Sequence, residues 1–364
     1  MRPTIMRVST DAIAHNAAQF RRAIPAHVKM MCVVKADAYG HGAIQTARKL
    51  ASANLADAFA VAIVEEAEAL RAAGLDQPIL ILGGGGEDSL RRAVRCGATQ
   101  AVYAPWMLDV MSDEARRLNA RAMAHLKLDT GMSRVGVRYN QDLDDLLNRW
   151  RECPEVAMTG AFTHFCVADT DPEFTELQRR RFRDGLDVIH AAGFRPIAHA
   201  AATSAMLNPD LQFEMVRPGI GLYGTGVEGM DLRYAQTLVT RPVRIQRIAA
   251  GDTVGYGRTF TAQRDSLIMT LPIGYGDGYP RILSNRAPVL VRGRRVPQVG
   301  RVCMDMLMAD VTDVPDVTLE DEVVLLGAQG SARITPDELA ELAGTIPYEI
   351  MLGFSPRVHT EWID

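Results

Sequence analysis

The chain has 364 residues, of which 48% are hydrophobic and 23% are charged. This composition is typical of a globular protein with a sizeable core, and it excludes a disordered chain. The formal net charge of −4 argues against a protein that binds nucleic acid or a membrane surface through a basic patch.

Several features bear on where the protein works. The sequence contains no uninterrupted apolar run long enough to span a bilayer, and residues 1–5 are not followed by the apolar segment of a secretion signal. Its five cysteines are scattered without CxxC spacing, which predicts neither a disulfide framework nor a metal site. We therefore expect a cytoplasmic protein with reduced thiols and no bound metal.

Short apolar runs alternate with amphipathic stretches over the first two thirds of the chain. Eight runs are compact and mainly apolar rather than strictly alternating, as in parallel strands covered on both faces: 28–34, 58–63, 78–82, 100–104, 122–128, 156–163, 197–201 and 213–216. Helical periodicity occurs between them at 43–53, 64–73, 89–96, 141–150 and 175–192. This alternation predicts a (β/α)8 barrel. A doubly wound sheet is the alternative, less favoured because no Gly-rich nucleotide motif is present.

The character of the sequence changes near residue 233. Strand-like runs rich in Val, Ile and Thr follow at 240–248, 267–272, 288–291, 295–302, 307–311 and 322–326, and helical periodicity returns at 336–343. We therefore predict an α/β protein with two domains, a barrel at 1–232 and a mainly β domain at 233–364.

The most informative segment is VVKADAYGHG at 33–42. Its Lys35 ends the first predicted barrel strand, and catalytic groups of such barrels gather at that end. Partial burial there lowers the pKa of a lysine and suits it to Schiff-base chemistry. A surface lysine is the plain alternative, which Tyr39 and the turn around Gly40 and Gly42 make less favoured.

This segment resembles the pyridoxal-phosphate attachment signature of alanine racemases. Six more segments resemble motifs of that family in the same order: LKLDTGMSR at 126–134, THF at 163–165, VRPGIGLYG at 216–224, GYG at 255–257, PIGYGDGY at 272–279 and GRVCMD at 300–305. One such motif is weak evidence for a relationship to this family, whereas seven motifs in the same order, in a resemblance that spans residues 8–358, are strong evidence. The resemblance implies a fold-type-III pyridoxal-phosphate enzyme that interconverts L- and D-alanine as a homodimer, with the cofactor in the barrel.

Racemisation removes the α-proton from one face of a planar carbanion and returns one to the other, which favours two bases on opposite faces. Lys35 serves one face, and the resemblance implies that Tyr256 serves the other from the partner subunit. Tyrosine needs nearby cations to act as a base near neutral pH. The resemblance offers His164, held against Arg217, as that help; a histidine with a structural role at a strand end is the alternative.

The resemblance makes Arg217 the residue that donates to the pyridine nitrogen of the cofactor. Because a guanidinium stays protonated, it discourages protonation of that nitrogen and leaves the ring a weaker electron sink. We expect this to suppress transamination. It also disfavours an amino-acid decarboxylase on the same barrel.

Hydroxyls and backbone N–H groups suit the phosphate of the cofactor. We expect it to be held by Tyr39, by Thr203 or Ser204, and by the N–H groups of Gly219 and Ile220. Relatives often read HxANS where this chain reads HAAATS at 199–204, so both hydroxyls stay open. The alternative role of these two hydroxyls is to cap the next helix.

The resemblance assigns the substrate carboxylate to Arg134 and to the backbone N–H of the partner subunit's Met304, with Tyr275 at the entrance. It makes Lys127 the lysine that is carbamylated in many relatives; a lysine paired with an acid is the alternative.

Two further expectations concern residues outside these assignments. His125 and His199 are expected to be structural or rim histidines. Pro356 stands where some relatives carry a tyrosine that contacts the phosphate.

Two other functions are compatible with the same motifs. A racemase of broader range would act on serine or basic amino acids. A non-catalytic pyridoxal-phosphate carrier would need only the barrel, so the β domain with Tyr256 and Met304 argues against it. An alanine racemase activity would serve either D-alanine supply for peptidoglycan or D-alanine catabolism.

Overall fold

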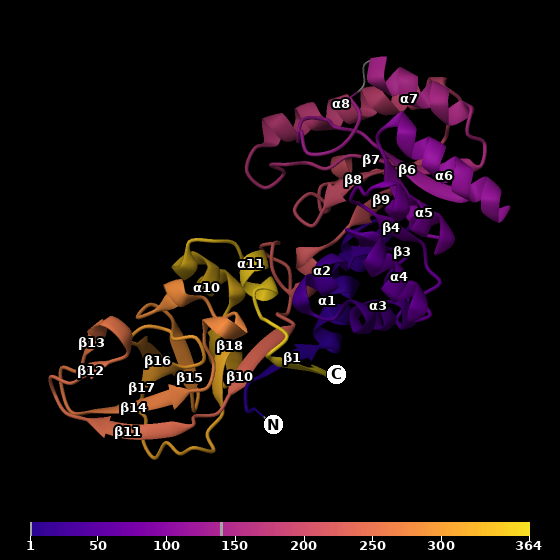
Figure 1. Ribbon diagram of the computed structural model, residues 1–364. Helices are drawn as coiled ribbons and strands as arrows, with labels where there is room; N and C mark the ends of the chain where they lie inside the picture. The colour runs from indigo at the N-terminus through magenta and orange to yellow at the C-terminus, as the bar shows by residue number, and fades with distance from the viewer. Residues whose placement is uncertain (1, 139–140) are drawn as a thin grey trace.

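The computed structural model describes residues 2–138 and 141–364. Figure 1 shows a barrel surrounded by helices at one end of an elongated molecule and a β-rich domain at the other. The chain ends lie near each other, beside strand β1 (Ile5–Ser9). Among the described residues, none of the helices combines the length and the apolar character that crossing a bilayer requires.

The predicted barrel is confirmed. Eight parallel strands close on themselves, with the first paired to the last. They are β2 (Lys29–Val33), β3 (Ala58–Val61), β4 (Ile79–Ile81), β5 (Thr99–Val102), β6 (Ala122–Lys127), β7 (Val156–Phe162), β8 (Ile197–Ala202) and β9 (Met215–Arg217). Strands β3, β4 and β5 are buried along their whole length, as expected of strands covered on both faces. Closure of the barrel excludes the doubly wound sheet.

Helices on the outside of the barrel connect these strands. They are α3 (Ala43–Ser52), α4 (Val64–Ala72), α5 (Glu87–Arg95), α6 (Pro105–Leu118), α7 (Gln141–Arg151), α8 (Pro172–Ala191) and the short α9 (Pro209–Gln212). Sequence periodicity predicted all of these except α6 and α9, and it also missed α1 (Thr10–Ala23), which precedes the barrel. Helix α6 begins with a proline in its first turn and ends at Asn119 in the left-handed conformation, two local signals typical of helix ends.

The second domain is built on a large, mainly antiparallel sheet, as predicted. Its strand order is β11-β14-β17-β16-β15-β18-β10-β1-β20, with β19 attached to β18. The strands are β10 (Gln236–Thr240), β11 (Arg244–Ile248), β14 (Ser266–Leu271), β15 (Pro288–Val291), β16 (Arg294–Val299), β17 (Leu307–Asp310), β18 (Val323–Gln329), β19 (Ala332–Ile334) and β20 (His359–Ile363). A small hairpin, β12 (Thr253–Val254) and β13 (Phe260–Thr261), and helices α10 (Pro336–Ala343) and α11 (Pro347–Leu352) complete it.

Two features of this sheet differ from the sequence-based expectation. The run 240–248 forms two strands rather than one, because it is interrupted at Pro242, which has no N–H to donate to a ladder. Strand β1 (Ile5–Ser9), at the start of the chain, pairs with β10 and with β20. The chain therefore enters the sheet of the second domain before it builds the barrel.

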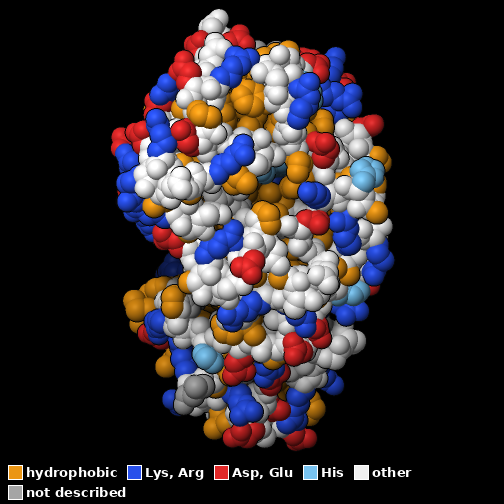
Figure 2. Space-filling model, turned by 90° about the vertical axis from the view of Figure 1, so that its right-hand side faces the viewer, with side chains coloured by type: hydrophobic (Ala, Val, Ile, Leu, Met, Phe, Trp, Pro, Cys, Tyr) orange, Lys and Arg blue, Asp and Glu red, His pale blue; other side chains and the backbone are white. Residues whose placement is uncertain are grey.

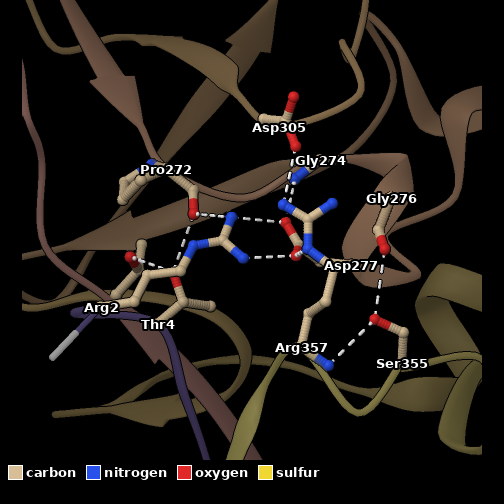
Figure 3. Close-up of polar contacts among 10 residues, drawn as sticks. Arg2, Thr4, Pro272, Gly274, Gly276, Asp277, Asp305, Ser355 and Arg357 are labelled. Carbon is tan, nitrogen blue, oxygen red and sulfur yellow. Dashed lines mark hydrogen bonds and ion pairs between the residues drawn. The ribbon is translucent and has the colours of Figure 1, made fainter.

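A charged cluster joins the two chain ends to the loop that carries Tyr275 (Figure 3). Arg2 donates to both carboxylate oxygens of the fully buried Asp277, at 2.5 and 2.6 Å. Arg357 lies 3.2 Å from Asp277 and donates to Asp305 at 2.7 Å. The cluster therefore holds together segments that lie far apart in the sequence.

The molecular surface agrees with the mild net charge. On the face shown in Figure 2, Lys and Arg side chains are interspersed with Asp and Glu side chains. This face carries no continuous basic surface.

Candidate active site

A cavity of about 620 Å³ lies at the carboxyl ends of the barrel strands. Because catalytic groups of parallel barrels gather at this end, it is the candidate active site. Ten residues singled out from the sequence line it: Lys35, Tyr39, Lys127, Arg134, His164, Thr203, Ser204, Arg217, Gly219 and Ile220. Three others, Tyr256, Tyr275 and Met304, do not line this cavity and lie in the second domain.

Lys35 opens a turn of unusual backbone conformation, α2 (Lys35–Gly40). The four residues after it have φ between +51° and +56°, a left-handed conformation that costs about 1 to 2 kcal/mol for each residue with a Cβ atom. Hydrogen bonds from Ala38 N–H to Val34 O and from Ala43 N–H to the Asp37 carboxylate hold the turn. Such strain is typical of functional sites; here it directs both Lys35 and Tyr39 into the cavity.

The surroundings of Lys35 favour its neutral form. Burial lowers the pKa of the ammonium, and the cations Arg134 and Arg217 lower it further, whereas Glu66 raises it. A lysine with a lowered pKa can act as a nucleophile and as a base.

Arg217 is a buried cation at the end of β9. Its guanidinium donates to the carbonyl oxygens of Thr163 and Ala200, each at 2.8 Å, and to ring nitrogens of His199 at 2.7 Å and His164 at 3.4 Å. Burial lowers the pKa of Arg217 to about 9, so it is protonated at neutral pH. The expected contact between His164 and Arg217 is present.

His199 is a contact of Arg217 that sequence reasoning missed. It lies on β8, the neighbour of β9 in the closed barrel, and it is closer to the guanidinium than His164. Its Nε2 lies 2.9 Å from Nδ1 of His125, so the two histidines form a chain leading away from Arg217. The signal that could have identified His199 is a polar side chain in the middle of an apolar strand, β8, directly before the strand that carries Arg217.

A second part of the cavity, lined by Thr203, Gly219 and Ile220, is rich in hydrogen-bond donors. Thr203 Oγ1 accepts the N–H groups of Gly219 and Gly221, at 2.9 and 3.4 Å, which leaves the hydroxyl proton of Thr203 to be donated elsewhere. Ile220 begins the 3-10 turn η1 (Ile220–Tyr223), so its N–H has no acceptor within that turn.

The Gly219 N–H donates to Thr203 within the protein, and its expected contact with a phosphate stays a prediction. The helix-capping alternative for Thr203 and Ser204 is wrong, because residues 203–207 form turns and the next helix is capped by Asn208.

A tyrosine that the sequence did not single out completes this end. Tyr348, on α11, lines the cavity, and its ring centroid lies 5.8 Å from that of Tyr39. Pro356 stands before Arg357, where some relatives carry a tyrosine. In this chain the tyrosine that lines the cavity is Tyr348, eight residues earlier. No local pattern identified this residue, since its position depends on the packing of α11 against the barrel.

Lys127, at the end of β6, is almost completely buried. Its Nζ donates to the Leu128 carbonyl oxygen at 3.2 Å and lies 4.9 Å from the centroid of the Phe162 ring. Burial, followed by the charges of Arg217 and Arg134, lowers its pKa to about 7. The charge of Asp129 raises the pKa of Lys127 in opposition to these effects, but the Asp129 carboxylate accepts backbone N–H groups and pairs with Arg138. Among the described residues, Lys127 has no carboxylate within ion-pair distance, so the alternative of a lysine paired with an acid is not met.

Tyr256, Tyr275 and Met304 line a second hollow, of about 880 Å³, on the β domain. The exposed fractions of the three residues are 72%, 42% and 53%. Glycines with positive φ flank Tyr256 on both sides and turn it outward, at the start of the 3-10 turn η2 (Tyr256–Arg258). One chain therefore does not bring Tyr256 and Lys35 into the same cavity.

The residues of the barrel cavity fit pyridoxal phosphate. Hydroxyls and a free N–H group at one end suit a phosphate, the Arg217 cation suits the ring nitrogen as acceptor, and Lys35 suits the aldehyde. The backbone at Gly219 also leaves room, since a Cβ atom there would lie 2.8 Å from Tyr39 Oη.

Comparison with known proteins covers nearly the whole chain. The families described as "Alanine racemase, N-terminal domain" and "Alanine racemase, C-terminal domain" match residues 8–226 and 235–362. "Alanine racemase 2" of Oceanobacillus iheyensis is 41% identical over 98% of this chain and 92% of its own length. "Alanine racemase" of Geobacter sulfurreducens is 41% identical over 98% and 96%.

Solved structures agree with these matches. The alanine racemase of Bacillus anthracis with bound L-Ala-P has a TM-score of 0.93 and 32% identity, covering 100% of this chain and 96% of that one. The alanine racemase of Streptomyces coelicolor has a TM-score of 0.94 and 31% identity, covering 100% and 98%.

Proposed function

The chain belongs to the alanine racemase family and is an isomerase, and from this we propose that it interconverts L- and D-alanine with pyridoxal phosphate and two bases, Lys35 and Tyr256, that come from two subunits. The observation that carries this proposal is the separation of the two bases. Lys35 lines the barrel cavity, whereas Tyr256 is 72% exposed on the other domain. A second copy of the chain, arranged so that its β domain covers the barrel cavity, would unite them.

Pyridoxal phosphate would supply an aldehyde that binds the amino group and a ring that stabilises negative charge at Cα. Tyr39, Thr203, Ser204, Ile220 and Tyr348 would hold its phosphate. Arg217 would face the ring nitrogen, and its positive charge would keep that nitrogen unprotonated. The ring would then be a weak electron sink, which favours reprotonation of Cα over transamination.

The two bases would work on opposite faces of the substrate. The lowered pKa of the Lys35 ammonium leaves an amine that can accept the α-proton. Tyr256 would accept or return the proton on the other face, helped by the positive charge of Arg217 through His164.

The remaining assignments concern the substrate. Arg134 and the backbone N–H of the partner's Met304 would hold the carboxylate of alanine, and Tyr275 would line the entrance. Lys127 would carry a carbamate, which turns a buried cation into an anion able to orient Arg134. The free cysteines are consistent with a cytoplasmic protein.

The proposal is tested by incubating the purified protein and pyridoxal phosphate with a panel of L-amino acids in D2O. We expect deuterated D-alanine and little product from bulkier substrates, read by NMR and chiral chromatography. Strong turnover of serine, lysine or arginine would favour the broader racemase. Absence of α-proton exchange with the cofactor bound would overturn the catalytic proposal.

A further inference from the structure

The carboxylate of Glu66 bridges the ends of two neighbouring barrel strands. Glu66 lies in the first turn of α4. Its Oε1 accepts the N–H of Ala36 at 2.5 Å, and its Oε2 accepts the N–H groups of Ala62 at 2.7 Å and Ile63 at 3.3 Å. Ala36 directly follows Lys35, and Ala62 follows β3 and lines the same cavity. The bond to Ile63 caps α4, whereas the bond to Ala36 serves the turn that carries Lys35.

That turn is strained, and its two ends are held in different ways. Tyr39, at its far end, packs against Tyr223 and Tyr348, and the Gly40 carbonyl accepts from Gln236. At the near end, the left-handed run begins at Ala36 with φ +51°, where Glu66 provides a contact from the neighbouring β–α unit. The orientation of the peptide that follows Lys35 therefore depends on this carboxylate.

Glu66 is also the anion among the charged groups that face Lys35. Arg134 and Arg217 both lower the pKa of Lys35, and the negative charge of Glu66 opposes them. His164 also faces Lys35, and its own pKa lies well below its usual value, chiefly because of burial, so it adds no positive charge near neutral pH.

We propose that Glu66 is a positioning residue for Lys35, which fixes the peptide after the lysine and balances the cations around it. This inference rests on the proposed role of Lys35 as the residue that binds the cofactor aldehyde.

Glu66→Gln would distinguish this positioning role from a role in packing alone. The glutamine side-chain amide has the same shape but only one acceptor oxygen and one donor group. It can accept from Ala36 or from Ala62 but not from both, and it carries no charge. Glu65→Gln is the matched control, because Glu65 is the preceding residue of the same helix and pairs with Arg92 at the surface.

The experiment adds pyridoxal phosphate to full-length protein freed of cofactor, reduces the product with borohydride and measures the modified Lys35 peptide by mass spectrometry. Failure of the unsubstituted protein to be modified at Lys35 would overturn the proposed function itself. If it is modified, we expect E66Q to bind pyridoxal phosphate about tenfold or more weakly than E65Q, because a charged hydrogen bond is lost. We also expect the pH midpoint of modification to move lower, because the ammonium loses a neighbouring anion.

Two more variants keep the inference falsifiable if E66Q folds poorly by circular dichroism. E66D keeps the charge but shortens the reach, so it should weaken binding while the midpoint stays near that of the unsubstituted protein. Ala36→Gly removes the strain at Ala36, so adding it to E66Q should restore binding but leave the midpoint low.

Two results would overturn the inference. One is binding by E66Q within about twofold of E65Q. The other is weaker binding with an unchanged midpoint, which would mean that Glu66 supports only the fold.

Discussion

Arg217 donates a hydrogen bond of 2.7 Å to Nδ1 of His199, and both side chains are buried in the barrel. Because Nδ1 accepts this bond, the proton of His199 lies on Nε2, which faces Nδ1 of His125 at 2.9 Å. Burial, followed by the charge of Arg217, holds the pKa of His199 well below its usual value. The guanidinium therefore carries the positive charge and the imidazole orients it.

We expect His199→Ala to disturb the orientation of Arg217. The substitution leaves a buried guanidinium N–H without its acceptor, which costs about 1 to 3 kcal/mol of unfolding free energy. Racemase activity should fall about tenfold or more, because a small displacement of a catalytic group is costly. Urea unfolding and steady-state kinetics measure the two effects. His27→Ala, at an exposed histidine, is the control; equal activity of both variants would contradict the role of His199.

Acid should destabilise the protein before its carboxylates titrate. Burial lowers the pKa of His41 to about 4 and that of His125 to about 3, and it lowers that of His199. Below about pH 6.5 the unfolded chain binds protons on these histidines that the folded chain does not bind, so stability falls as pH falls. Each histidine contributes a slope of about 1.4 kcal/mol per pH unit. Urea unfolding at several pH values between about 7.5 and 5.5 measures it; a flat profile would contradict the buried neutral histidines.

A shared active site predicts complementation between two inactive variants. Lys35→Ala and Tyr256→Phe should each lose turnover, and Tyr256→Phe should keep its bound cofactor. A dimer of one subunit of each kind contains one intact site and one doubly substituted site. Refolding the two variants together should therefore restore about a quarter of the unsubstituted activity. No recovery, with mixed dimers shown by native mass spectrometry, would contradict the proposal that the bases come from different subunits.

The buried Lys127 should react with carbon dioxide. Its neutral amine is the nucleophile, and with a pKa of about 7 the neutral form predominates above that pH. With 13C-labelled bicarbonate, we expect a carbamate resonance that grows from about pH 6 to about pH 8. It should be lost in Lys127→Met and kept in Lys29→Met, at an exposed lysine. A resonance that persists in Lys127→Met would assign the carbamate elsewhere.

Asp277 should be the main stabilising member of the charged cluster in Figure 3. Asp277→Asn removes the charge that two arginines share in a buried position. We expect a loss of about 1 to 3 kcal/mol, since Arg2 and Arg357 can regain solvent. Asp305→Asn, at the exposed side of the same cluster, should cost less. Urea unfolding at neutral pH compares them; equal losses would show that burial of Asp277 is not what matters.

Much of the fold could be predicted from sequence because the signals are local. Each barrel strand lies in a mainly apolar run, and helix α10 has a threonine cap, a proline in its first turn and a glycine after its end. The residues of the barrel site could be predicted from the resemblance of their motifs to those of the racemase family, and barrel geometry explains why they meet, since the carboxyl ends of all strands lie at one rim. Ten of them do lie in one cavity.

The missed residues depend on contacts between segments that are distant in sequence. His199 meets Arg217 because their strands are neighbours in the closed barrel, and Tyr348 reaches the cavity because α11 packs against the turn after Lys35. Glu66 reaches Ala36 from the neighbouring β–α unit, thirty residues further along the chain. Sequence patterns over a few residues therefore do not reveal these long-range contacts.

Periodicity and motif order in the chain were enough to establish a barrel, a β domain and the residue types of a racemase. The tertiary structure decided that β1 joins the second sheet, that the peptide after Lys35 is left-handed, and that Tyr256 lies outside the cavity that Lys35 lines. The physical reason is the range of the forces involved. Burial patterns and turn preferences act over a few residues, whereas strand partners, strained turns and shared sites depend on hydrogen bonds and packing across the whole molecule.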